Sequence, residues 1–273
     1  MGVTLAQRIV RFSVAFAVYA FAGVTVPLFL LFAGGWWLPK TIDTGGAQLP
    51  VTVSVLIDVA LLVLFGVQHS GMARPAFKAW LTRWVPEPLE RSVYITMACL
   101  AVWLLCLAWQ PLPQRIWALD GVAGWLLDGG FWLGFAVVYA ATLLLDHFHL
   151  LGLAQAYRAY VSQVPDPTAD RLQVHGPYRL VRHPLMTGLL LCFWCASTFT
   201  VGQLLWAAVM TGYIVLGTVL EERDLVRRFG DDYRRYASAV PAFFPAPLGR
   251  RIFRARGTAD TSTGSGQTYS PSA

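Results

Sequence analysis

The chain of 273 residues is 56% hydrophobic and only 13% charged, and its mean hydropathy is +0.53. Soluble domains are typically about 25% charged, so this composition excludes an ordinary soluble domain and indicates an integral membrane protein. The net charge of +6 lies mostly in loops and in the C-terminal region, where it reports membrane topology, and we expect no nucleic-acid partner.

Apolar runs recur along the chain at lengths near the ~20 residues that a helix needs to cross a bilayer. They cover Ile9–Phe32, Val51–Gly66, Val93–Trp109, Phe131–Leu151, Leu185–Thr200 and Leu204–Leu220. The last two are short, and a turn is predicted between them at Val201–Gln203, so they form a C-terminal hairpin that is tilted or shielded by neighbours. The predicted fold class is an all-α integral membrane protein with about five to six transmembrane helices.

Connections that are rich in basic residues alternate along the chain with connections that have few of them. The N-terminus, the second and fourth connections and the region after Leu220 are rich in Arg, whereas the first and third connections hold only Lys40 and Arg115. The positive-inside rule therefore predicts that both termini lie in the cytoplasm.

The four cysteines lie inside apolar runs, so we interpret them as buried thiols and not as a disulfide framework.

From Gly257 to Ala273 the chain turns to Gly, Ser and Thr without an apolar pattern, and we predict a disordered tail over residues 249–273.

The entrance to the hairpin, His175–Pro184, combines a turn with basic residues. Pro184 suits the first turn of a helix, whose free N–H groups form an anion site together with Arg179 and Arg182. Gly188, one turn later, leaves room for a ligand or for a close helix contact. A basic juxtamembrane loop that touches lipid phosphates would contain the same residue types.

Two adjacent carboxylates, Glu221 and Glu222, end the second arm of the hairpin. Acidic groups next to a nearly apolar segment indicate a functional site, because carboxylates are costly at membrane depth. They suit a ligand ammonium or ribose hydroxyls. The alternative is a helix end that reaches water, with Glu222 paired to a nearby Arg.

These motifs together resemble a known group of membrane enzymes. The pattern G-P-Y-R-x-x-R-H-P, then E-E-x-x-L, F-G-x-x-Y-x-x-Y and V-P, resembles the C-terminal half of the isoprenylcysteine carboxyl methyltransferase and phospholipid methyltransferase group. Upstream, Phe65–Pro75 resembles the F-x-x-Q-H-S-x-M-A-R-P motif of bacterial methanethiol S-methyltransferases and their NnrU-like relatives. The resemblance spans roughly Val51 to Pro245; one departure is Met186, where many relatives have Tyr.

The resemblance implies transfer of a methyl group from S-adenosylmethionine to methanethiol, giving dimethyl sulfide, in the bacterial inner membrane and without a metal. It assigns residues 1–174 to the substrate side and residues 175–248 to a hairpin with a cytoplasmic cap that holds the cofactor. The implied cofactor-binding residues are Gln155, His175, Gly176, Pro177, Tyr178, Arg179, Arg182, His183, Pro184, Gly188, Glu221 and Glu222.

The implied catalytic residues are Arg182, Glu221 and His69. A thiol reacts as its thiolate, so a base is needed. His69 is the first candidate, with His147 and His149 as alternatives, and a positive environment without any base is also open. The structural alternative for His69 is a hydrogen bond to a neighbouring helix.

Two other functions share parts of the pattern. The same fold acts on a prenyl-cysteine or lipid acceptor in related enzymes, and an NnrU-like membrane protein without enzymatic activity shares the Gln68-His69 pair. A transporter lacks support, because no inverted repeat is visible.

Overall fold

The computed structural model describes residues 4–47, 49–144 and 176–245, and between them residues 153, 157, 160, 161, 172 and 174. Within these residues the chain is mostly helical, and five helices are long and apolar enough to cross a membrane. The predicted class, an all-α integral membrane protein, is confirmed. The predicted tail 249–273 lies outside the described residues.

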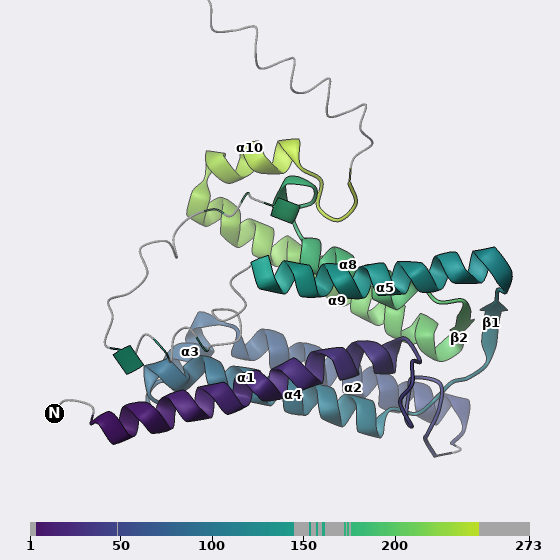
Figure 1. Ribbon diagram of the computed structural model, residues 1–273, viewed down its shortest axis with the longest axis horizontal. Helices are drawn as coiled ribbons and strands as arrows, with labels where there is room; N and C mark the ends of the chain where they lie inside the picture. The colour runs from purple at the N-terminus through teal and green to yellow at the C-terminus, as the bar shows by residue number, and fades with distance from the viewer. Residues whose placement is uncertain are drawn as a thin grey trace, which may run out of the picture.

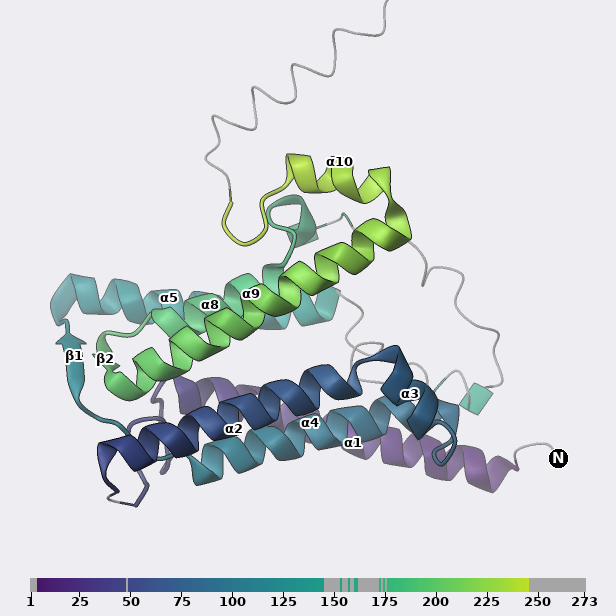
Figure 2. The same cartoon turned by 180° about the vertical axis from the view of Figure 1, so that it is seen from behind.

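The first half of the chain forms one layer of helices (Figures 1 and 2). This layer contains α1 (Leu5–Ala33), α2 (Val51–Met72), α3 (Pro75–Leu81) and α4 (Glu87–Ala108), and α4 packs against both α1 and α2. Local sequence defines several ends: Thr4 and Gln7 form a capping box at the start of α1, and Pro86 precedes α4.

The second half forms a layer that faces the first (Figure 2). It contains α5 (Gly121–Leu144), the short 3₁₀ helix η1 (Gly176–Arg179), α8 (Pro184–Trp194), α9 (Val201–Phe229) and α10 (Asp231–Ala239). α5 and α8 approach closely where Gly134 meets Gly188, since a Cβ at Gly188 would lie 2.8 Å from the Gly134 oxygen.

The hairpin differs from its predicted bounds. The turn predicted at Val201–Gln203 is wrong: these residues are the first turn of α9, because Thr200 caps the helix and Gln203 bonds back to it. The chain instead reverses just before, where β2 (Thr198–Thr200) pairs antiparallel with β1 (Arg115–Ala118). α8 has 11 residues, so at 1.5 Å per residue it covers only about half of a ~30 Å hydrocarbon core.

Aromatic side chains fill the space between the layers at the β1–β2 end. Trp206 of α9 is 1% exposed and packs against Phe29, Phe32, Trp109 and Phe193 with ring centroids 5.2–5.9 Å apart. This packing holds α9 against the first layer, and its 29 residues extend about 44 Å, so its last turns project beyond the bundle and carry the two glutamates.

Candidate functional site

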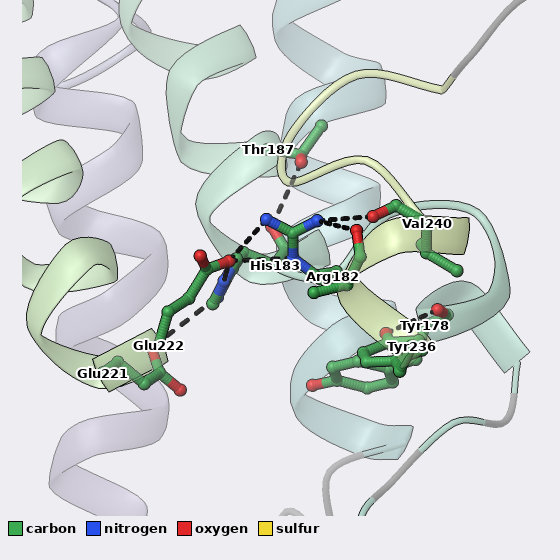
Figure 3. A network of polar contacts seen from close by, with 9 residues as sticks. Tyr178, Arg182, His183, Thr187, Glu221, Glu222, Tyr236 and Val240 are labelled. Carbon is green, nitrogen blue, oxygen red and sulfur yellow. Dashed lines mark hydrogen bonds and ion pairs between the residues drawn. The ribbon is translucent and has the colours of Figure 1, made fainter. Parts of the chain in front are cut away.

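Arg182 and Glu222 form the centre of a polar network at the mouth of the hairpin (Figure 3). Nε and Nη2 of Arg182 lie 2.8 and 2.7 Å from Oε1 of Glu222. Nη1 donates to the carbonyl oxygens of Ala237 and Val240 at 2.9 and 2.5 Å. The guanidinium is thus held by protein groups on α9 and at the end of α10. The pairing of Glu222 with a nearby Arg, which the sequence left open as an alternative, is the arrangement observed.

His183 lies between the two carboxylates and is 7% exposed. Its Nε2 lies 3.0 Å from Oε1 of Glu222, and its Nδ1 lies 3.6 Å from Oε2 of Glu221. The two glutamates therefore differ: Glu222 is engaged by Arg182 and His183, whereas the side chain of Glu221 is 53% exposed and has one longer contact.

The chain after α10 folds back onto the entrance to α8. The N–H groups of Arg182 and His183 donate to the carbonyl oxygens of Pro241 and Ala242 at 2.8 and 3.0 Å. The Thr187 hydroxyl donates to the carbonyl oxygen of Phe243 at 2.6 Å. The end of the described chain thus closes one side of the site.

A cavity of about 270 Å³ opens beside this network and has both polar and apolar walls. Glu221 lines it while Glu222 does not, which agrees with the different contacts of the two carboxylates. Its other walls are Leu172, Tyr178, Arg182, His183, Pro184, Leu185, Met186, Leu225, Arg228, Phe229, Tyr233 and Tyr236.

Tyr233 is a wall residue that the candidate list from the sequence missed. It is 2% exposed, and its hydroxyl lies near the Glu222 carboxylate without a close hydrogen bond in the part of the chain that the structure describes. Burial raises the pKa of the Tyr233 phenol well above its usual range, so the hydroxyl stays protonated and can donate to a ligand. Its position in the F-G-x-x-Y-x-x-Y pattern was the available signal.

Only some of the remaining predicted cofactor residues line this cavity. Tyr178 and Pro184 line the cavity, and the Tyr178 carbonyl accepts a 2.7 Å hydrogen bond from the hydroxyl of Tyr236. Burial and the nearby Glu221 carboxylate raise the pKa of Tyr178. The other residues of η1 are Gly176, Pro177 and Arg179, of which Gly176 and Arg179 are exposed.

The sequence left two roles open for Gly188, room for a ligand or a close helix contact, and the structure shows the helix contact. It is buried against α5 and is not among the wall residues of the cavity. Gln155 and His175 lie outside the described residues, as do the alternative bases His147 and His149.

His69, the predicted base, lies in the last turn of α2 and faces a different cavity. The hydroxyl of Tyr94 on α4 lies 3.0 Å from Nε2 and 3.2 Å from Nδ1 of His69. The guanidinium of Arg91 lies 5.2 Å from the Tyr94 ring centre. His69 therefore makes the contact to a neighbouring helix that the sequence left open as the alternative, and it also lines this cavity.

This second cavity has a volume of about 310 Å³ and is bounded by α1, α2, α4, α5 and α8. Most of its walls are apolar, and Leu185 belongs to both cavities. The structure thus places the Glu221 cavity and the His69 cavity on either side of the first turn of α8.

The described residues hold no group of three or more His, Cys, Asp or Glu side chains that could bind a metal ion. That the reaction proceeds without a metal therefore stays a prediction. The network can hold a ligand that has both cationic and aromatic parts, because it combines a carboxylate, a phenol donor and aromatic rings.

Comparison with known proteins gives two sets of relatives. Methanethiol S-methyltransferase 2 of Bradyrhizobium diazoefficiens is 39% identical over 238 residues, which cover 86% of this chain and 91% of that protein. Methanethiol S-methyltransferase of Mycobacterium tuberculosis is 41% identical over 220 residues, 79% of this chain and 88% of that protein. Nurim of Sus scrofa is 31% identical over 190 residues, 64% of this chain and 69% of that protein. No protein-family model and no solved structure matches the chain.

Proposed function

This chain belongs to the methanethiol S-methyltransferase family, and from that premise we propose that it transfers a methyl group from S-adenosylmethionine to methanethiol, giving dimethyl sulfide. The observation that carries the proposal is the pair of cavities that meet at Leu185, one partly polar and one apolar. Methyl transfer between a charged donor and a small apolar thiol needs two such compartments side by side.

The Glu221 cavity suits S-adenosylmethionine. The buried Tyr233 hydroxyl lines this cavity and can donate to a ribose or carboxylate oxygen, and the Glu221 carboxylate can accept from an ammonium or from ribose hydroxyls. The aromatic side chains of Tyr178, Phe229 and Tyr236 can contact a purine ring. When bound, this cofactor supplies a methyl group already activated by its positive sulfur.

In this proposal Arg182 has a positioning role. Its described side-chain contacts are to Glu222 and to the carbonyl oxygens of Ala237 and Val240, so it holds the wall of the cavity in place. Glu221 is then the carboxylate that faces the cofactor, and Glu222 is the one that anchors Arg182 and His183.

On the thiol side, we propose that His69 accepts the proton. Its contact with the Tyr94 hydroxyl can fix the orientation of its ring. The thiol gives its proton to a nitrogen of His69 and becomes the stronger nucleophile. The apolar walls of the cavity keep bulk water away from the reacting sulfur.

The proposal extends to location and organisation. Residues 1–174 supply the thiol side and residues 175–248 the cofactor side, in an inner membrane with both termini in the cytoplasm. The alternation of basic loops supports this orientation.

The test uses purified protein in detergent with S-adenosylmethionine and methanethiol, and it follows dimethyl sulfide in the headspace. We expect product from the parent and a loss of at least about tenfold in Glu221→Gln, through the loss of a charge-assisted contact. Asp224→Asn is the matched control, because Asp224 is on the same helix, 63% exposed and paired with Arg227 one turn away. Absence of dimethyl sulfide from folded parent protein would refute the proposed function.

A further inference from the structure

The His69 cavity is larger than methanethiol requires. Its volume is about 310 Å³, whereas a water molecule takes about 30 Å³ of liquid and an apolar cavity of about 150 Å³ is large enough to bind benzene. Methanethiol has two non-hydrogen atoms, so it would fill only a small part of this space.

The walls are those of a site for an apolar body. They include the side chains of Phe29, Phe65, Ile95, Ala98 and Leu189. Thr25, a polar wall residue, already donates to the carbonyl oxygen of Phe21 and accepts from the indole of Trp103. A large apolar group can therefore enter without leaving the Thr25 hydroxyl unpaired.

The His69 cavity also has an apolar neighbour. A further apolar cavity of about 240 Å³ shares the wall residues Thr25, Phe29 and Val102 with the His69 cavity and ends beside Lys40. Leu185, which the His69 cavity shares with the cofactor cavity, does not line this further cavity. A thiol bound with its sulfur near Leu185 and His69 thus has room for a long or bulky substituent behind it.

We propose that the protein also methylates aryl-alkyl and branched alkyl thiols, of which phenylmethanethiol is the test case. This inference rests on the proposed function, since it uses the same donor and the same reacting atoms. The thiol passes its proton to His69, and its sulfur forms a bond to the donor methyl carbon. The electron pair of the broken carbon–sulfur bond stays on the donor sulfur, which becomes a neutral thioether.

The experiment gives the purified full chain S-adenosylmethionine with either methanethiol or phenylmethanethiol and measures both methyl thioethers by gas chromatography. We expect KM to be at least about tenfold lower for phenylmethanethiol, because one buried methylene alone changes specificity by about 10–200-fold.

Two variants connect the activity to this cavity. Ala98 is a buried wall residue of α4, and Ala98→Phe places a ring that takes about half of the cavity by the benzene comparison. This change should lower kcat/KM for phenylmethanethiol at least about tenfold more than for methanethiol. Leu100→Phe is the control, because Leu100 is on the same helix but 49% exposed.

A second readout needs no methyl donor. Benzyl methyl sulfide should raise the thermal unfolding midpoint of the parent and of Leu100→Phe but not of Ala98→Phe. Methylation of methanethiol alone by the parent would overturn the inference and leave the proposed function intact. Equal methylation of phenylmethanethiol by all three proteins would overturn the assignment to this cavity. Product from neither thiol would overturn the proposed function and this inference with it.

Discussion

Replacing Glu222 by Gln should loosen the closure of the site while leaving the fold of the bundle intact. One oxygen of Glu222 receives contacts from Arg182 at 2.8 and 2.7 Å and from His183 at 3.0 Å. Hydrogen bonds to charged groups contribute about 1.5–3 kcal/mol each, and breaking a buried ion pair costs about 3–5 kcal/mol.

The expected loss in free energy is smaller than these contributions added together, because water screens the ion pair of Arg182 and Glu222. The side chains of Arg182 and Glu222 are 14% and 27% exposed, and Gln keeps an oxygen that can accept from Arg182. We therefore expect a loss of about 2 kcal/mol in the free energy of local opening.

Hydrogen exchange followed by mass spectrometry measures this opening directly. The amides of Arg182 and His183 donate to the carbonyl oxygens of Pro241 and Ala242, so they exchange only when the segment after α10 detaches. A loss of about 2 kcal/mol corresponds to about 30-fold faster exchange at these amides. Glu221→Gln is the control, and it should leave their exchange rates unchanged because the contact of Glu221 to His183 is 3.6 Å long.

The reasoning fails if Glu222→Gln leaves these exchange rates unchanged, or if both variants accelerate exchange equally. The first result would mean that Arg182 is held by the carbonyl oxygens of Ala237 and Val240 alone. The second would mean that the two adjacent carboxylates share one role.

Three further predictions concern the two cavities and the helix contact between α5 and α8. Glu221→Gln should raise the Kd for S-adenosylmethionine, measured by calorimetry, at least about tenfold through loss of a charge-assisted contact, and an unchanged Kd would remove Glu221 from the cofactor site. His69→Gln should lower kcat for methanethiol by about 10²–10⁴-fold with unchanged cofactor binding. The loss in kcat relative to the parent should shrink as rising pH forms thiolate in solution. A loss in kcat that does not depend on pH would argue against His69 as the base. Gly188→Ala should lower the thermal unfolding midpoint through about 1–3 kcal/mol of overpacking, since its Cβ would meet the Gly134 oxygen at 2.8 Å. Gly212→Ala, with nothing within 4 Å, should be neutral or stabilising by up to about 1 kcal/mol.

Much of the fold follows from local sequence. Apolar runs of membrane length predicted the positions of the long helices, because a helix in lipid must satisfy its own backbone and show an apolar surface over its whole length. The turn was misplaced because composition alone cannot separate the first turn of an apolar helix from the loop before it; the capping pair Thr200 and Gln203 was the missed signal.

The motifs at Arg182–Pro184 and Glu221–Glu222 could be recognised from the sequence, but the separate roles of the two glutamates could not. In the sequence, Glu221 and Glu222 are two adjacent glutamates that nothing distinguishes. Only the approach of α9 to the start of α8 pairs Glu222 with Arg182 and leaves Glu221 facing the cavity. The same holds for Leu185, an ordinary apolar residue in the sequence. It becomes the shared wall of two cavities only because the two helix layers, far apart in the chain, meet at that point.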